Sequence, residues 1–391
     1  MKGEIMKKRL FKIVSLLSIF VLLISGCGQA EDEKTAADDK STGTAFTVTD
    51  LAGVEHSFDK PLDRVIVQWS GAGGPFMTMS ALLGEDIADH LAGIDNTLQD
   101  YKADMWEQIT KSVPKLADVP MIGSVDEKFD LDTVLASDAQ AMILPLELKE
   151  TVETSVGPKL KEAGIPVVYI DYHQGTVENH RKSTLLLGRL FDKEEKAQEL
   201  VEFYIAHRND VEYRATELLK TVESPSLYIE VGVNGPSKLG DSYDNTYFWG
   251  DIAHKAGASN VGNGIVDKTG PMDLDYIAAI DPDKIVFTGS YWPEYPESVR
   301  MGLDADEETA KQLIAAYGER PGWDELSAFK NGHVYGIYHG LAREMYDCAA
   351  YEFFAKICFP DEFSDLDPNK TLKEYFDEFL PYDFDGLWFL Y

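Results

Sequence analysis

A short segment that occurs twice in this chain constrains its fold more than any other feature. The two copies are residues 129–138, FDLDTVLASD, and residues 272–281, MDLDYIAAID, and each has the pattern of a short helix. An apolar run of strand length follows each copy, at residues 141–144 and 284–287. The same helix and strand unit thus appears in both halves of a 391-residue chain, which is longer than one core usually supports. We therefore expect two similar lobes.

Apolar runs bounded by turn residues alternate with helical stretches along most of the chain. Five of these runs have the character of buried strands, at residues 64–67, 141–144, 167–170, 227–231 and 284–287. This alternation is typical of βα units around a mainly parallel sheet. The predicted fold class is α/β, with two Rossmann-like lobes at residues 46–192 and 222–391.

Residues 193–221, between the two lobes, contain no glycine or proline and place apolar side chains at mostly helical spacing. As one helix this segment would be about 43 Å long, at about 1.5 Å per residue. We expect a rigid connecting helix that limits movement of the lobes, because a hinge needs residues that are free to change φ and ψ. The alternative is a long helix that packs on one lobe only.

The N-terminus has the pattern of a targeting segment. Basic residues precede an apolar run, residues 13–24, which is too short to span a bilayer as a mature helix. The run ends in LISGC, which resembles a lipobox, so we predict a lipoprotein signal peptide at residues 1–26 and a lipid on Cys27. Residues 27–45 are almost without apolar side chains and are expected to form a disordered tether. The alternative is an ordinary signal peptide with a chance cysteine.

The chain is strongly acidic, with a formal net charge of −32. Nucleic acid is excluded as a partner class, because its binding needs clustered lysines and arginines that displace counterions. A local basic pocket remains compatible with this charge. Cys348 and Cys358 lie in one predicted helix, roughly 15 Å apart at about 1.5 Å per residue, so they cannot pair there. They are expected to be buried thiols.

Sequence motifs of common enzymes are missing. The chain has no Gly-x-Ser-x-Gly, His-Glu-x-x-His, Walker or Cys-x-x-Cys pattern. We therefore predict that the protein is not an enzyme and has no cofactor. A secreted lipoprotein hydrolase is the rival class, and turnover of ester, phosphate or glycan substrates would favour it.

Several weak motifs gain specificity from their order along the chain. They are the opening FTVTDLAG, the segment from Gly123 to Ala136, the segment from Leu274 to Val286, and FKNGHVY at residues 329–335. In this order, over residues 46–359, they resemble the ABC-importer periplasmic binding proteins for iron(III)-siderophore, haem and cobalamin. In that family two lobes are joined by one long helix, and the ligand lies in a cleft between them.

This resemblance implies an extracytoplasmic solute-binding lipoprotein, a monomer that is anchored to the membrane by its lipid. Its implied partners are an ABC permease and its ATPase subunits. The implied ligand is an iron(III) complex of the siderophore type. Haem, cobalamin, a free metal ion, and molybdate or tungstate are alternatives within the same fold.

The family also places an acidic residue on each lobe, where it meets arginines of the permease. Asp275 matches the acidic position of the C-terminal lobe. On the N-terminal lobe, Thr78 stands where many members carry glutamate. Asp132, the counterpart of Asp275 in the repeat, or Glu85 and Asp86 are the candidates for the second docking contact.

Ligands of open α/β sheets bind at the carboxyl ends of the strands, so the loops there supply the candidate binding residues. In the N-terminal lobe a glycine-rich loop could turn its N–H groups toward an anion, and a tight turn without ligand is the alternative. The candidates in this lobe are Trp69, Ser70, Gly71, Gly73, Gly74, Tyr172, His173 and Arg181. Those in the C-terminal lobe are Tyr247, Trp249, Tyr291, Trp292, His339, Arg343 and Tyr346.

Phenolate and imidazole groups among these candidates are ligands suited to Fe(III). Tyr172, His173, His339 and Tyr346 are therefore the candidate metal ligands, with a purely structural hydrogen-bonding role as the alternative for each. Arg343 and Arg181 are the candidate anion partners, since guanidinium groups match chelating oxygens. An ion pair with a nearby acid is the alternative for Arg181.

Overall fold

The computed structural model describes residues 45–71 and 73–391. The predicted signal peptide, the lipidation site Cys27 and the predicted tether up to residue 44 lie outside the described residues. Within the described part of the chain, no helix has the length and apolar character needed to cross a membrane.

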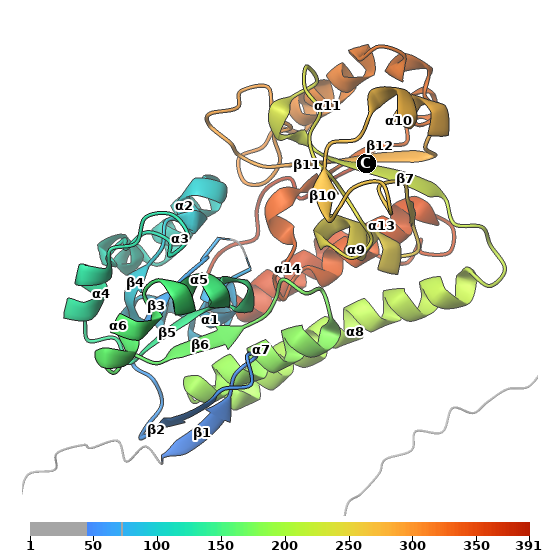
Figure 1. Ribbon diagram of the computed structural model, residues 1–391. Helices are drawn as coiled ribbons and strands as arrows, with labels where there is room; N and C mark the ends of the chain where they lie inside the picture. The colour runs from blue at the N-terminus through green and yellow to red at the C-terminus, as the bar shows by residue number, and fades with distance from the viewer. Residues whose placement is uncertain (1–44, 72) are drawn as a thin grey trace, which may run out of the picture. The chain divides into compact units, whose positions relative to one another are not determined.

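The N-terminal lobe is built on a four-stranded parallel sheet (Figure 1). Its strand order is β4-β3-β5-β6, with bounds Leu91–Ile94, Val65–Val67, Ala141–Pro145 and Val167–Ile170. An antiparallel hairpin of β1 (Phe46–Thr49) and β2 (Glu55–Phe58) precedes this sheet. The helices of this lobe are α1 (Phe76–Leu83), α2 (Thr97–Tyr101), α3 (Ala103–Ser112), α4 (Leu131–Ala136), α5 (Lys149–Thr154), α6 (Gly157–Glu162) and α7 (Val177–Leu190).

The C-terminal lobe is built on a five-stranded sheet in the order β13-β12-β11-β7-β9. The bounds, in the same order, are Phe389–Leu390, Val334–Tyr338, Lys284–Gly289, Ser226–Val231 and Ser259–Asn260, and only β13 is antiparallel to its neighbour. A short antiparallel pair, β8 (Ser242–Tyr243) and β10 (Thr269–Gly270), lies outside this sheet. The helices are α9 (Phe248–Lys255), α10 (Leu274–Ile280), α11 (Glu307–Ala315), α12 (Ser327–Asn331), α13 (Cys348–Cys358) and α14 (Pro368–Phe379).

The sequence repeat corresponds to a capped helix followed by a central strand in each lobe. The Asp130 carboxylate accepts a hydrogen bond from the N–H of Thr133 at the start of α4, and Asp273 does the same for Tyr276 in α10, both at 3.0 Å. Such caps satisfy backbone N–H groups that have no partner inside the helix. Strands β5 and β11 follow, so the prediction of two α/β lobes with a repeated unit is confirmed.

The long helix between the lobes is α8 (Glu194–Leu218), which packs on both of them. It contacts α7 of the N-terminal lobe and α13 of the C-terminal lobe, and Figure 1 shows it running past both. Gly188 of α7 permits the close approach, because a Cβ there would lie 2.4 Å from the Cβ of Ala197. The alternative of a helix packed on one lobe only is therefore wrong.

Buried polar bonds tie α8 to the loop after β6. Arg208 is 1% exposed, and its guanidinium donates to the Tyr204 hydroxyl at 2.6 Å and to the Gly175 carbonyl at 2.7 Å. The same carbonyl accepts a bond of 2.6 Å from Lys255 Nζ in α9. One carbonyl of the N-terminal lobe is thus held by the connecting helix and by the C-terminal lobe.

The two remaining cysteines lie at the ends of α13, as predicted, and neither forms a disulfide. Both are buried in the core, and burial raises the pKa of the Cys358 thiol to about 12. Because the thiolate is the reactive form, these cysteines are packing residues.

Candidate functional site

A cavity of about 400 Å³ lies between residues of the two lobes. The N-terminal lobe contributes Gly71, Tyr101 and Lys102, and the C-terminal lobe supplies the rest of the lining: Val231, Val233, Tyr243, Tyr247, Phe248, Thr269, Trp292, His339, Gly340, Ala342 and Arg343. Several of these residues follow the carboxyl ends of parallel strands, among them Val231 at the end of β7 and His339 directly after β12. This is the position at which open α/β sheets bind their ligands.

Arg343 is the most unusual group of this cavity. Its guanidinium lies over the rings of Phe248 and Tyr247, with distances from Cζ to the ring centroids of 4.4 and 5.1 Å. Its Nε and Nη2 atoms are buried and have no hydrogen-bond partner among the described residues. A buried charged donor without a partner is unfavourable in free energy. The cavity is therefore set up to receive acceptor atoms, and anionic oxygens match a guanidinium best.

A second cation reaches the cavity from the N-terminal lobe. Lys102, between α2 and α3, donates from Nζ to Glu344 Oε1 at 3.0 Å, and the two side chains are only 3% and 1% exposed. Burial raises the pKa of Glu344 to about 7, while the nearby Lys102 acts in the opposite direction. This ion pair connects the two lobes directly behind the cavity.

His339 supplies a neutral imidazole to the cavity wall. Its Nδ1 lies 2.8 Å from the Thr288 hydroxyl, and its ring packs among Phe248, Trp249 and Trp292. Burial, together with the charges of Arg343 and Lys102, lowers the pKa of His339 to about 3. His339 thus stays uncharged at neutral pH.

The charge of this cavity is opposite to that of the whole chain. Among the described residues that line it, Lys102 and Arg343 are cationic and none is an aspartate or glutamate. The chain as a whole has a formal net charge of −32.

An adjoining cavity, also of about 400 Å³, shares Tyr247 with the first one. It contains charges of both signs, and its lining includes Glu147, Asp171, His173, Lys255 and Lys268. His173 Nδ1 lies 2.7 Å from the Glu147 carboxylate, which lowers the pKa of Glu147 through this hydrogen bond. The Trp69 ring packs against His173 with a centroid distance of 5.1 Å.

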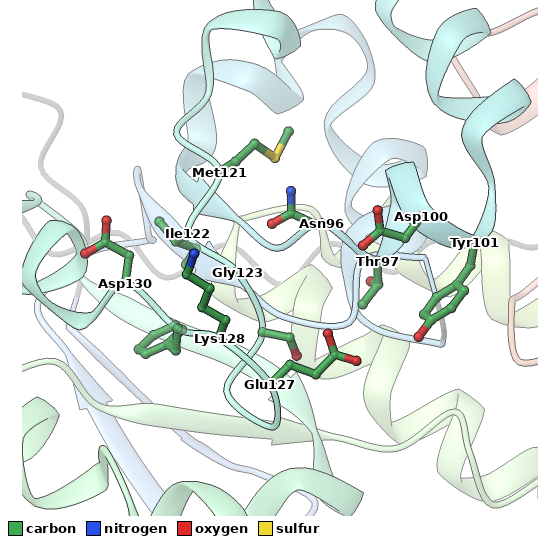
Figure 2. A pocket seen from close by; sticks show the side chains of 12 residues that line it. Asn96, Thr97, Asp100, Tyr101, Met121, Ile122, Gly123, Glu127, Lys128 and Asp130 are labelled. Carbon is green, nitrogen blue, oxygen red and sulfur yellow. The ribbon is translucent and has the colours of Figure 1, made fainter. Parts of the chain in front are cut away.

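A third cavity, of about 620 Å³, is formed by the N-terminal lobe alone. Figure 2 shows residues 96–101 on one wall and residues 121–130 on the other. It shares Tyr101 with the cavity between the lobes, and three acids and one lysine line it: Asp100, Glu127, Asp130 and Lys128. This cavity is larger, but among its described lining residues none has a buried donor without a partner as Arg343 does, so the cavity between the lobes is the candidate site.

The structure brings five of the predicted binding residues together around one cavity. They are Gly71, Tyr247, Trp292, His339 and Arg343. Gly73 lies next to them, since a Cβ there would be 2.8 Å from the Cβ of Arg343 and 3.0 Å from His173 Nε2, and its φ of +74° also favours glycine. His173 lines the adjoining cavity, and the Trp69 ring packs against His173.

Other predicted binding residues have structural roles. The Ser70 hydroxyl donates to buried Asp95 at 2.6 Å, and Gly74 is required by a tight turn, because a Cβ there would lie 2.2 Å from the Trp69 carbonyl oxygen. Arg181 forms an exposed ion pair with Glu178 at 2.9 Å, which was the alternative for that residue.

Four further candidates lie outside the cavity lining. Tyr172 is fully buried with its hydroxyl 3.0 Å from Thr184, and Tyr346 is buried against Tyr375 and Trp388. Trp249 is buried behind His339, and Tyr291 is exposed beneath the guanidinium of Arg300. Neither of the two buried tyrosines lines the cavity between the lobes. The predicted set of Tyr172, His173, His339 and Tyr346 is therefore not brought together as metal ligands.

Nine of the lining residues are not in the predicted set, and Tyr101, Lys102 and Phe248 are the most prominent of them. Tyr101 and Lys102 follow strand β4, a four-residue run with an internal glycine, LAGI, which was not predicted as a strand. Had β4 been recognised, its loop would have been examined like the others. Phe248 is adjacent to two predicted residues, but nothing in its sequence context distinguishes it from a core phenylalanine.

The proposed docking acids are all on the surface. Asp132 and Asp275 occupy equivalent exposed positions in the first turns of α4 and α10, and Glu85 and Asp86 are exposed after α1. Thr78 is 1% exposed, so its position in this chain is not available for docking.

Comparisons with known proteins agree with this architecture. The family model described as "Periplasmic binding protein" matches residues 154–339. A search of the curated proteins finds no match. The solved structure of the TroA-like periplasmic binding protein FepB from Veillonella parvula is 41% identical, with a TM-score of 0.85, and the match covers 88% of this chain and 99% of that one.

Two more distant structures show the same fold. A periplasmic solute binding protein from Veillonella parvula is 20% identical with a TM-score of 0.66, covering 88% of this chain and 94% of that one. MolA of Haemophilus influenzae, solved with bound molybdate, is 16% identical with a TM-score of 0.61, covering 87% of this chain and 99% of that one. From the two-lobed fold and the extended similarity to FepB, this chain belongs to the TroA-like periplasmic binding proteins, the substrate-binding components of ABC transporters.

Proposed function

We propose that this chain is a lipid-anchored substrate-binding protein that captures an iron(III) complex and delivers it to an ABC permease. The complex would be of the siderophore type, with anionic chelating oxygens. The observation that carries the proposal is the buried guanidinium of Arg343, whose Nε and Nη2 have no partner in the cavity between the lobes. Catecholate, hydroxamate or carboxylate oxygens would supply the missing acceptors.

The shape and lining of the site support a chelate in preference to a bare ion. The rings of Tyr243, Tyr247, Phe248 and Trp292 offer apolar faces around the two cations. The cavity and its neighbour, each of about 400 Å³, lie within the range of roughly 300–1,000 Å³ that small-molecule sites occupy. Within the described residues, no cluster of three or more His, Cys, Asp or Glu side chains is arranged to hold a metal ion. In this proposal the iron arrives with its coordination supplied by the chelator.

A small oxyanion is the second candidate. The pair of cations would suit molybdate or tungstate, and the MolA structure, which has the same fold, contains molybdate. Against this candidate, a tetrahedral oxyanion would fill only a small part of the cavity, and the aromatic rings would contribute little to its binding.

The test is a binding panel with the purified mature protein. Intrinsic tryptophan fluorescence and native mass spectrometry would be used, because Trp292 lines the cavity. The panel contains ferric catecholate, hydroxamate and citrate complexes, haem, cobalamin, free Fe(III) and Ni(II), molybdate and tungstate. We expect one ferric chelate per protein. Saturable binding of molybdate or tungstate alone would establish the second candidate, and turnover of ester, phosphate or glycan substrates would favour the hydrolase alternative.

A further inference from the structure

The ion pair between Lys102 and Glu344 has a feature that its structural role does not explain. Lys102 lines the cavity and donates to Glu344 Oε1 at 3.0 Å. The other oxygen, Oε2, is buried and has no hydrogen-bond partner among the described residues. Glu344 also directly follows Arg343, the residue with the unpaired guanidinium. Only one of the two carboxylate oxygens therefore has a hydrogen-bond partner among the described residues. This carboxylate lies where a ligand would meet both Lys102 and Arg343.

An anionic guest changes the charge balance around Glu344. Its oxygens would lie beside Lys102 and Arg343 and would compete with Glu344 for the ammonium group of Lys102. A second anion in the same buried space raises the free energy of the ionised carboxylate, and weaker contact with Lys102 raises it further. Protonation of Glu344 removes both penalties and gives Oε2 or Oε1 a hydrogen to donate.

The ionisable groups around Glu344 are two further charged residues and four tyrosines. Those that face it or interact with its charge are Lys102 between α2 and α3, Asp347 before α13, Tyr338 of β12, Tyr346, Tyr375 of α14, and Tyr172 after β6. Burial raises the pKa of all four tyrosines well above 10, so they stay neutral. Burial also raises the pKa of Glu344 to about 7, and Asp347 adds to this effect while Lys102 opposes it.

We propose that capture of an anionic chelate is coupled to the uptake of a proton from solvent by Glu344, which frees Lys102 from its ion pair to become a second cationic contact for the ligand. The coupling rests on the proposed function, because it requires an anionic guest. It makes the interlobe ion pair a part of the binding equilibrium.

The direction of the pH dependence follows from linkage. Free protein loses the Glu344 proton near pH 7, whereas the complex holds it to higher pH, so above about pH 7 the complex binds more protons than the free protein. Affinity should fall as pH rises above about 7, by up to about tenfold per pH unit if one proton is coupled. Below about pH 6 both states are protonated, and the affinity should be independent of this group.

Calorimetry tests the coupling. Three anionic probes are titrated at pH 6 and pH 8: the ferric complex of 2,3-dihydroxybenzoate, ferric citrate and molybdate. Each titration is made in two buffers with different enthalpies of ionisation, from which the number of protons taken up is obtained. Wild type should take up protons at pH 8, and Glu344→Gln should take up none and bind with the same affinity at both pH values. Lys102→Met should also lose the proton uptake, and it should bind more weakly.

The matched control is Glu352→Gln. Glu352 is another buried acid of the C-terminal lobe, 2% exposed, but both of its oxygens are satisfied, by His207 and Thr371 at 2.8 Å. This variant should keep the proton uptake and the pH dependence of wild type. Circular dichroism verifies that each variant is folded.

Three outcomes would overturn the proposal in different ways. A probe that binds with equal proton uptake in wild type and in Glu344→Gln would overturn the coupling and leave the proposed function intact. A probe that binds wild type without proton uptake at pH 8 would do the same. If none of the probes binds, the proposed function fails and the coupling with it.

Discussion

Replacing Arg343 by methionine should separate ligand binding from folding. In the ligand-free protein Nε and Nη2 make no hydrogen bond with the described residues, so their removal breaks none there. The loss is confined to the contacts with Phe248 and Tyr247, at about 2 kcal/mol for a desolvated cation–π interaction, and methionine retains much of the packing. The midpoint of thermal unfolding should therefore change by only a few degrees.

The effect on binding should be much larger. Two charge-assisted hydrogen bonds to the ligand are lost, each with a contribution of about 1.5–3 kcal/mol. Since about 1.4 kcal/mol corresponds to a tenfold change in affinity, Kd should rise by roughly 100-fold or more. The measurement is tryptophan fluorescence titration with the ferric chelate that binds wild type best, alongside differential scanning calorimetry without ligand.

Arg181→Met is the matched control. Arg181 is the other candidate anion partner from the sequence, but it is exposed and paired with Glu178, so its removal should alter neither affinity nor stability by more than about 1 kcal/mol. Unchanged affinity in Arg343→Met would refute the assignment of Arg343 as the anion partner. Equal losses in both variants would show that the effect is general electrostatics, not contact in the cavity.

Four further predictions concern other parts of the molecule. Asp275→Lys should abolish uptake in cells while leaving ligand affinity intact, and normal uptake by this variant would contradict a contact of Asp275 with the permease. Asp132→Lys tests the equivalent position of the other lobe. X-ray scattering with and without ligand should show little compaction, because α8 packs on both lobes and carries no hinge. The Arg320 guanidinium donates to both carboxylate oxygens of buried Glu230, at 2.7 and 2.8 Å. Arg320→Met removes this partner and should lower the free energy of unfolding by about 3–5 kcal/mol in urea titrations. A loss below about 1 kcal/mol would show that Glu230 finds other partners. Cys27→Ala should move the protein from the membrane fraction to the soluble fraction, and unchanged fractionation would contradict the lipid anchor.

The fold could be predicted well because its signals are local and repeated. Asp130 and Asp273 are caps, a role that depends only on the following three residues, so the two copies of the segment identify the same unit in each lobe. The length of α8 likewise follows from the absence of glycine and proline in one stretch of sequence.

The site was predicted only in part, because the whole fold determines which side chains of a loop face the cavity and which are buried in the core. Arg343 and Tyr346 are three residues apart after the same strand, yet one lines the cavity and the other is buried against Trp388. Sequence assigns both to a loop at the edge of the sheet, but it does not show which side chain turns toward the opposite lobe. Lys102 was missed for a different reason, since a short strand with an internal glycine gives almost no periodic signal.

The packing of α8 also affects how this protein unfolds. Buried side chains one turn apart on α8 contact different lobes. The Tyr204 ring stacks on His180 of the N-terminal lobe with a centroid distance of 5.0 Å, and Arg208 Cζ lies 4.5 Å from the ring centroid of Tyr351 in the C-terminal lobe. The core of each lobe includes side chains of this helix, and the described residues of both lobes belong to one compact unit. Two lobes that look separable in topology should consequently melt in a single cooperative transition, and a fragment cut on either side of the helix would lack part of its core.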